Sequence, residues 1–489
     1  MKVDKLTRKA IEGLSRLIIS LMPKSYFTTP QEADKYMLRG DELFRSKAGE
    51  CFTCGFGKAV LTPDDISSGK YFIAGYNSNN PAQGVLDDIY ARAFYMDDNT
   101  GSGGVVVCSV DAVGISRRDI NDIRKIVLES GKIASLKSIC VCATHTHSGI
   151  DTQGLWGEKL YKSGRNEEFM TELKSKTAQA IISAYENRQN GKMFYSVLET
   201  EDLQCDYRTP DVFDKNLTKI RFEAENGEGI CLVSFACHAE LLGSRHTSVS
   251  ADFPAYMIRE IEENNKNMQA LFLNGAIGGM ISAKEVKKIY RHEIDCVQYT
   301  MDYGKALGQL VNGMTQEEEL FPVINVKSVP IKIKASNFVL ILARLLKVLN
   351  NDIYRGKKRS EALISSETGY MELGKRQIGI FLIPGELFPE LWNGEFMSAE
   401  ESATGKEAEY TVLKQMNHCD HNFVIGLCND ELGYIIPDND FLVNEKLPYI
   451  NSAKDRHGRN HYEETNSTGK EAARTILETM QKLIEGELL

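Results

Sequence analysis

Short apolar runs, each followed by polar or glycine-rich residues, recur along this chain of 489 residues. The run at 139–143 (ICVCA) is rich in β-branched residues and cysteine, which is typical of a strand buried on both faces. The run at 105–110 has the same character, and apolar residues at helical spacing predict a helix at 117–130 between the two. A strand, a helix and a strand at this separation form a right-handed βαβ unit with parallel strands.

Further apolar segments extend this pattern towards the C-terminus. Helical spacing predicts a second helix at about 166–186. Strands are predicted at about 194–198, 219–222, 230–236, 268–273, 377–383 and 423–427. We therefore expect an α/β fold in which one or more mixed central β-sheets are flanked by helices.

Chemically active side chains follow several of these strands. His145 and His147 come directly after the ICVCA strand and, two residues apart on extended backbone, would face the same side. His238, Glu386 and Tyr434 follow three later strands. Because open α/β sheets place their sites at strand ends, we expect a metal site there, and zinc accepts neutral imidazoles with one position left open for catalysis. The alternative for an isolated His-x-His pair is one buried and one exposed histidine without a metal.

Composition limits the functions that these residues can serve. Hydrophobic residues make up 42% of the chain, which is enough for a large core. The net charge of −10 excludes the basic footprint of a nucleic-acid-binding protein, so we expect no nucleic-acid partner. Several of the eleven cysteines lie in apolar runs, where cysteine behaves as a small hydrophobic residue. We therefore expect a reducing, cytoplasmic location.

The first 50 residues are expected to form a helical extension, followed by a single catalytic domain at 51–489. The apolar run at 17–22 is too short for a signal peptide or a membrane span. No run reaches ~18 apolar residues, so no transmembrane helix is predicted. Helical spacing instead predicts an amphipathic helix with five apolar residues on one face: Ile11, Leu14, Leu17, Ile18 and Leu21.

A second apolar segment lies at 337–350 (NFVLILARLLKVLN) and is followed by basic residues up to Arg359. One interpretation is a packing helix with a solvated tail. The other is that residues 337–360 form a lid over the pocket or a helix at a membrane surface. The sequence leaves peripheral membrane contact open as an alternative.

Several short motifs occur in a fixed order along the chain. They lie at 91–94 (ARAF), 143–149 (ATHTHSG), 235–238 (FACH), 384–386 (PGE) and 429–434 (NDELGY). In these motifs the sequence resembles the catalytic domain of the neutral/alkaline non-lysosomal ceramidase family, from Gly57 to about Gly469. The resemblance implies one zinc ion held by four residues: His145, His238, Glu386 and Tyr434. It also implies that His147 lies beside the metal and the substrate, and that Arg208 and Tyr462 contact the substrate.

The implied centre would be hydrolytic. Zinc lowers the pKa of a bound water molecule to about 7 and polarises a carbonyl oxygen. His147 could pass a proton to a leaving amine, and Arg208 or Tyr462 could stabilise an oxyanion. From the residues alone, Arg208 could equally be an ion-pair partner of Asp206 or Asp211.

Some positions depart from the family pattern. The ceramidases carry a serine with an assigned role after the Asn-Gly strand, but the aligned position here is Ile281 and Ser282 comes one residue later. A histidine that is usual near the ARA motif is replaced by Leu86. We expect neither a C-terminal immunoglobulin-like domain nor a secretion signal. Asp252 is expected to cap a helix rather than to catalyse.

The sequence thus favours a zinc-dependent hydrolase that cleaves an amide bond with a zinc-activated water molecule. Its substrate would be a small-molecule or lipid-like N-acyl compound similar to ceramide. Two alternatives stay open: a zinc hydrolase of another bond or of a small polar substrate, and a metal-bearing binding protein without turnover. The shape of the cavity above His145 should separate a lipid from a small polar substrate.

Overall fold

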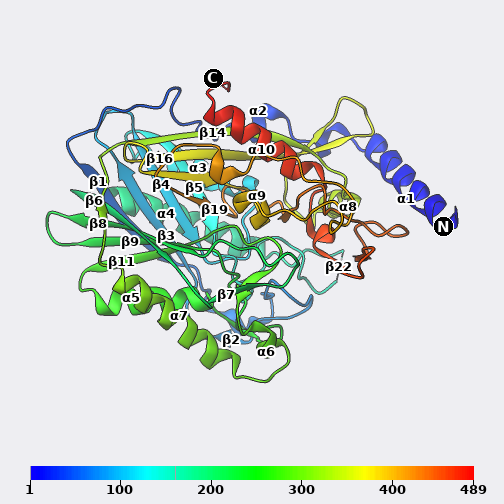
Figure 1. The fold of residues 1–489 in the computed structure, drawn as a ribbon, viewed down its shortest axis with the longest axis horizontal. Helices are drawn as coiled ribbons and strands as arrows, with labels where there is room; N and C mark the ends of the chain where they lie inside the picture. The colour runs from blue at the N-terminus through cyan, green and yellow to red at the C-terminus, as the bar shows by residue number, and fades with distance from the viewer. Residues whose placement is uncertain (1, 160, 489) are drawn as a thin grey trace.

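Two β-sheets packed face to face form the centre of the computed structural model, which describes residues 2–159 and 161–488 (Figure 1). Within those residues, the larger sheet has nine strands in the order β11-β9-β8-β6-β1-β3-β4-β5, with β13 beside β6. Only β4–β5 and β9–β11 are parallel pairs among them. The strands are β1 (Phe52–Val60), β3 (Tyr90–Asp97), β4 (Gly104–Val110), β5 (Leu136–Ala143), β6 (Gln189–Glu199), β8 (Asn216–Ala224), β9 (Gly229–Phe235), β11 (Met268–Asn274) and β13 (Glu318–Glu319).

The second sheet comes from the C-terminal part of the chain. In the described residues it has five strands in the order β14-β16-β17-β19, with β15 beside β16. Its only parallel pair there is β17–β19. The strands are β14 (Ile324–Lys334), β15 (Ile353–Arg355), β16 (Ala362–Leu373), β17 (Ile378–Leu382) and β19 (His421–Ile425).

Helices cover the outer face of each sheet, which gives four layers. Figure 1 shows α10 on one side and α5 with α7 on the other, while α3 and α4 pack on the β3–β5 part of the larger sheet. The longer helices are α1 (Lys2–Leu21), α3 (Arg117–Glu129), α4 (Glu167–Glu186), α5 (Phe253–Asn264), α7 (Cys296–Gly313), α8 (Phe338–Leu345) and α10 (Glu471–Ile484). Shorter elements are α2 (Pro30–Ala33), α6 (Val286–Tyr290), α9 (Pro389–Asn393), β2 (Gly84–Val85), β7 (Gln204–Asp206), β10 (Ser248–Val249), β12 (Ile281–Ala283), β18 (Glu386–Leu387), β20 (Tyr434–Ile435), β21 (Ala453–Lys454) and β22 (Asn460–His461).

The expected α/β fold with mixed sheets flanked by helices is confirmed. The predicted βαβ unit is β4-α3-β5, and its two strands are parallel, with Val107 opposite Cys140. The predicted later strands correspond to β6, β8, β9, β11, β17 and β19. Nothing in the periodicity indicated that the C-terminal strands form a separate sheet, because strand pairing is a long-range contact.

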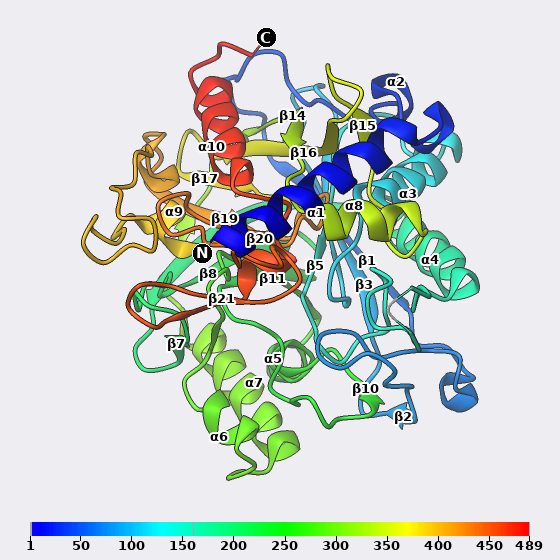
Figure 2. The same ribbon diagram turned by 90° about the vertical axis from the view of Figure 1, so that its right-hand side faces the viewer.

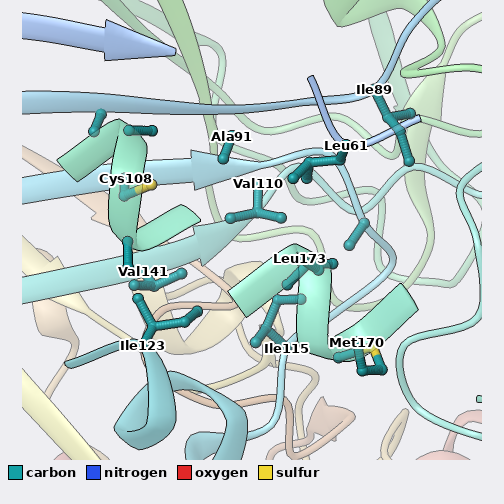
Figure 3. Close-up of a cluster of buried hydrophobic side chains, with 14 of the residues drawn as sticks. Leu61, Ile89, Ala91, Cys108, Val110, Ile115, Ile123, Val141, Met170 and Leu173 are labelled. Atoms are coloured by element: carbon teal, nitrogen blue, oxygen red, sulfur yellow. The ribbon is translucent and has the colours of Figure 1, made fainter. Parts of the chain in front are cut away.

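The apolar composition of residues 139–143, the C-terminal part of β5, has a direct structural cause. Ile139 and Val141 point towards α3 and α4, where Figure 3 shows Val141 beside Cys108 and Ile123. Cys140 and the alternate residues of β5 point the other way, into the core shared by the two sheets. Because side chains alternate along a strand, a strand between two apolar layers has no solvent-facing position.

A buried ion pair fixes β5 between the layers. The guanidinium of Arg124, on α3, donates to the carbonyl oxygen of Ile139 at 2.9 Å and to Oε1 of Glu367 on β16 at 2.6 Å. Arg117 Nε approaches the same carboxylate at 3.3 Å. These charge-assisted hydrogen bonds connect α3, β5 and the second sheet, so they hold the strand that carries the first two histidines in place.

The two segments expected to be amphipathic or apolar lie together. Figure 2 shows α1 beside α8, and Ile19 of α1 packs in one cluster with Ile341 of α8. Leu14 and Leu17 share another face of α1 that is exposed, and the Ile11 side chain lies outside the described residues. The α8 helix is shorter than its apolar spacing indicates, because Lys347 adopts a left-handed backbone with φ of 58°. No helix in the described residues has both the length and the apolarity needed to span a bilayer.

Candidate metal centre

Three imidazoles meet at the ends of β5 and β9. The possible ligand atoms of His145, His147 and His238 all lie within 4.8 Å of one another. Nε2 of His147 is 3.2 Å from Nε2 of His145. A carboxylate completes the cluster, since Oε2 of Glu386 lies 3.2 Å from Nε2 of His238 and 3.6 Å from Nε2 of His145. The structure therefore brings together side chains that are up to 241 positions apart in the sequence.

The backbone at the first histidine is not extended. The expectation of extended backbone at His145 is wrong, because this residue has φ of 64°. The β5 strand ends at Ala143, and the amide of His145 then donates to the carbonyl of Ala112 at 3.0 Å. A left-handed conformation costs a non-glycine residue about 1–2 kcal/mol, and such strain persists where the surrounding structure enforces it. The turn, rather than strand alternation, aims both rings at one point.

Backbone carbonyls fix two of the rings. His145 Nδ1 is 2.6 Å from the carbonyl oxygen of Val113, and His238 Nδ1 is 2.8 Å from that of Ile281. A carbonyl oxygen can only accept, so each Nδ1 carries a proton, and Nε2 is the ring atom of each histidine that faces the cluster. This arrangement is typical of metal-binding histidines. Ile281 thus contributes to the site through its backbone, although its side chain is apolar.

Glu386 and Tyr434 reach the cluster on two short neighbouring strands. They are direct partners in the parallel pair β18–β20. The phenol of Tyr434 lies 3.3 Å from the sulfur of Met280. Burial would raise the pKa of Glu386, but the adjacent His145 and His238 rings outweigh it and hold that pKa below its usual range. Glu386 is therefore an ionised oxygen donor beside a phenol.

These side chains match the requirements of a zinc ion. Nε2 of His238 lies 3.2 Å from an ionised oxygen of Glu386, and this contact needs either a proton or a cation between the two atoms. Burial lowers the pKa of His238, but the Glu386 and Glu240 carboxylates outweigh it and raise that pKa. Burial lowers the pKa of His145, and burial together with the other imidazoles lowers that of His147 well below its usual value. Imidazoles with a carboxylate and a phenol form a mixed nitrogen and oxygen donor set of the kind that zinc accepts.

His147 has surroundings that the sequence did not reveal. Its Nδ1 lies 4.0 Å from Oε2 of Glu240, which also accepts hydrogen bonds from the hydroxyls of Tyr76 at 3.0 Å and Tyr290 at 2.7 Å. A β-carbon on Gly75 would come within 2.5 Å of the His147 side chain, so only glycine permits this approach. The one available signal for Glu240 was its position two residues after His238.

A cavity of about 340 Å³ opens above these residues. Its polar side includes His145, His147, Glu386 and Tyr434. Its other wall is apolar and is formed partly by α8; the apolar lining residues are Val113, Leu155, Trp156, Leu340, Leu349, Ile353, Ile364 and Leu432. The segment expected as a packing helix or a lid therefore borders the cavity.

Arg208 and Tyr462 lie outside the cavity lining. The buried guanidinium of Arg208 pairs with Asp440 at 2.7 Å and with Glu463 at 3.1 Å. The structure thus favours an ion-pair role, but with partners other than those expected, because Asp206 accepts only from the backbone amide of Arg208. The ring of Tyr462 packs edge to face against that of Tyr434, with 6.4 Å between the ring centroids, so it neighbours a proposed ligand.

Three other sequence expectations concern residues near the site. Asp252 caps α5, as expected, since its carboxylate accepts from the amide of Phe253 at 2.8 Å. Ser282 is fully buried on β12 and does not line the cavity, and neither does Leu86. The two family positions with a changed residue therefore contribute no side chain to the cavity wall.

Comparisons with known proteins identify a matching family and similar folds. Residues 52–285 match the family described as neutral/alkaline non-lysosomal ceramidase, N-terminal. The crystal structure of neutral ceramidase from Pseudomonas aeruginosa is 16% identical, with a TM-score of 0.64 over 89% of this chain and 75% of that one. A structure described as ceramidase complexed with C2 is 15% identical, with a TM-score of 0.61 over the same shares. At these identities the structural likeness shows the fold alone.

Proposed function

Because residues 52–285 belong to the neutral/alkaline non-lysosomal ceramidase family of hydrolases, we propose that this protein is a zinc-dependent hydrolase of an N-acyl amide bond. The observation that carries the proposal is the meeting of three imidazoles and the Glu386 carboxylate beside a half-apolar cavity, which His145, His147 and Glu386 line. Hydrolysis of an N-acyl amide needs polar groups beside the reacting carbonyl and an apolar wall for the acyl chain.

His145, His238, Glu386 and Tyr434 would hold the zinc ion. When bound, zinc supplies a Lewis acid for the amide carbonyl and makes a water molecule acidic near neutral pH. The donors are held before any ligand arrives, since Val113 and the β18–β20 pair fix their orientation. Support for this set is the approach of Nε2 of His238 to Oε2 of Glu386, at 3.2 Å, where a cation can take the place of a proton between them.

His147 would move the proton. Burial keeps its pKa well below the usual value, so the ring is neutral at physiological pH and can accept a proton at Nε2. The Glu240 carboxylate, 4.0 Å from Nδ1, would stabilise the protonated ring while it donates to the leaving amine. Tyr462 would support Tyr434, and Arg208 would keep the acidic loop beside it in place.

The cavity lining bears on the alternative of a small polar substrate. Leu155, Trp156, Leu340 and Leu349 all face the space above the donors, and an apolar wall favours a substrate with a hydrocarbon portion. A volume of about 340 Å³ suits one end of a lipid-like amide. Ceramide and related N-acyl compounds are therefore the substrate class that we propose.

Metal analysis followed by activity assays tests the proposal. The purified protein should contain one equivalent of zinc and should release free amine from a panel of N-acyl substrates that includes short-chain ceramide. Removal of the metal with a chelator should stop turnover, and zinc should restore it. Zinc-loaded protein that cleaves esters or phosphodiesters but no amide would contradict the proposal, and inactivity towards every class would favour a binding protein.

Replacing Ser282 with alanine should change turnover little. We propose attack by water without a serine nucleophile, because Ile281 stands where the ceramidases carry serine and Ser282 is buried on β12. The kcat of Ser282→Ala should stay within about tenfold of the wild type. Steady-state kinetics check this, and trapping of an acyl group on any serine would contradict it.

We further propose that the face formed by α1 and α8 contacts an anionic lipid surface. Its exposed apolar residues are Leu14, Leu17, Leu21 and Leu346, and its exposed cations include Arg16, Lys24 and Lys347. An apolar stripe flanked by basic residues is typical of helices that lie in the membrane interface. Since Leu340 and Arg344 of α8 also line the cavity, such contact would bring a lipid-like amide to the site.

Replacing Leu17 and Leu21 with serine should weaken vesicle binding. Each leucine is more than half exposed, and losing two such contacts should reduce sedimentation with phosphatidylserine-containing vesicles by at least about tenfold. Leu43→Ser is the matched control, because Leu43 is 70% exposed but lies near α10. Equal loss in the control, or no binding by the wild type, would contradict the proposal.

We also propose a reducing, cytoplasmic location. All eleven cysteines lie in the described part of the chain, and none of them forms a disulfide there. Their free state supports the proposal, because paired cysteines are typical of oxidising compartments.

A further inference from the structure

The cavity wall carries two polar side chains that the proposed hydrolysis does not use. Gln153 lies in the loop that follows β5, and Glu431 lies in the loop that follows β19. Both line the same cavity as His145 and Glu386. Gln153 is 93% buried, since its exposed fraction is 7%. They form a polar patch beside the metal donors.

Each of these side chains has an atom without a hydrogen-bond partner. Nε2 of Gln153 and Oε2 of Glu431 are both buried and unpartnered. The other oxygen of Glu431 is held in place, because it accepts from the amide of Gly433 at 2.7 Å. An unpaired buried donor or acceptor destabilises the protein because it has lost its hydrogen bonds to water, and a bound ligand that pairs both atoms would remove this cost.

The two atoms belong to one place in the wall. A β-carbon on Gly114 would lie 2.6 Å from Cγ of Glu431 and 3.1 Å from Nε2 of Gln153. Both side chains therefore pack against the backbone of Gly114. The preceding residue, Val113, provides the carbonyl that holds the His145 ring. The residue against which the patch packs, Gly114, therefore directly follows the residue that orients His145.

The chemistry of the patch identifies the group that it would bind. Burial and the nearby Glu386 carboxylate raise the pKa of Glu431, so its Oε2 accepts a hydrogen bond when ionised and donates one when protonated, and the amide nitrogen of glutamine donates one. A hydroxyl group fits both states of Glu431, because it can donate one hydrogen bond and accept two. A hydroxyl group can satisfy both at once, whereas an ammonium group only donates and a methyl group does neither. We propose that Glu431 and Gln153 bind a hydroxyl group of the substrate close to its scissile amide. This inference rests on the proposed amide hydrolysis and adds a determinant of specificity to it.

The hydroxyl could belong to the amine portion or to the acyl portion, and matched substrates separate these sources. One pair is the octanoyl amides of 2-aminoethanol and of ethylamine. The other pair is the ethylamides of 2-hydroxyoctanoic and of octanoic acid. With zinc-loaded protein, kcat/KM for the hydroxylated member of one pair should exceed that of its partner by about 100-fold or more, because a site built to bind a hydroxyl rejects the analogue that lacks it.

Substitutions then assign the preference to the patch. In Gln153→Met and Glu431→Met, which keep side-chain length but remove the polar atoms, the preference should fall to within about threefold, mainly through slower cleavage of the hydroxylated amide. Leu155→Met, on the apolar wall of the same cavity, is the matched control and should keep the preference. Melting temperature and zinc content show whether each variant folds.

The outcomes separate this inference from the function on which it rests. Equal kcat/KM within both pairs would overturn the hydroxyl subsite and leave amide hydrolysis intact. A preference that survives in both methionine variants would also overturn it. Inactivity of the zinc-loaded wild type towards all four amides and the wider N-acyl panel would overturn the proposed function and the subsite together.

Discussion

Replacing His238 with alanine should leave the protein without its metal and without measurable turnover. His238 is completely buried, its ring is oriented by the carbonyl of Ile281, and its Nε2 faces Glu386. Removing the ring takes away one of four proposed donors and leaves the carboxylate without its neighbour. Zinc affinity should fall by more than about 100-fold, which is the loss that changes to the supporting groups around a metal can cause. Equilibrium dialysis with metal analysis measures this loss.

His145→Ala should behave in the same way, because its Nε2 also points at Glu386. A histidine outside the centre provides the control. His421 is hydrogen-bonded to Thr218, and His421→Ala should retain zinc even if its melting temperature falls. Full zinc occupancy in both His145→Ala and His238→Ala would eliminate the proposed ligand set.

Replacing His147 with alanine should separate catalysis from metal binding. If His147 moves the proton, the variant keeps its zinc and its fold, but kcat falls by about 10²–10⁴. The reason is that the His147 ring lies beside the four proposed ligands but is not one of them. The Glu240 carboxylate is also close enough to balance the charge of the protonated ring. Zinc content, melting temperature and turnover should be measured on the same preparation.

Three results are possible for this variant, and each assigns a different role to His147. Retained zinc with slow turnover supports the proton transfer. Loss of zinc would make His147 a ligand in place of Tyr434, in agreement with the grouping of the three imidazoles within 4.8 Å. Wild-type turnover with intact zinc would refute any catalytic role. Tyr434→Phe is the complementary variant, since it removes only the phenol oxygen and should weaken zinc binding if Tyr434 is a ligand.

Much of the scaffold could be predicted from the sequence because burial on both faces makes a strand recognisable. Residues 139–143 of β5 are all apolar, since alternate residues face α3 on one side and the second sheet on the other. The positions of His145 and His238 after such strands followed directly. These are local signals, in which the pattern of a segment reflects the layer that contains it.

The parts of the site that the sequence did not predict depend on contacts between distant segments. The left-handed backbone of His145 is imposed by Ala112 and Val113, and the partners of Arg208 come from residues more than 230 positions later. Glu431 was part of a recognised motif, but its unpaired oxygen becomes evident only where the loop meets Gly114. Hydrophobic periodicity carries no information about such loop contacts.

The division of the donors between the two sheets has a consequence for the order of folding. His145 and His238 follow strands of the larger sheet, whereas Glu386 and Tyr434 belong to a pair that follows strands of the second sheet. Neither sheet alone offers a complete set, so tight zinc uptake requires that the two have already docked through their shared apolar core. The ion would then act as a cross-link over the 148 positions between His238 and Glu386, and the stabilisation of the docked state would grow with the logarithm of its affinity. Zinc uptake during refolding should therefore report the moment at which the two halves of the molecule come together.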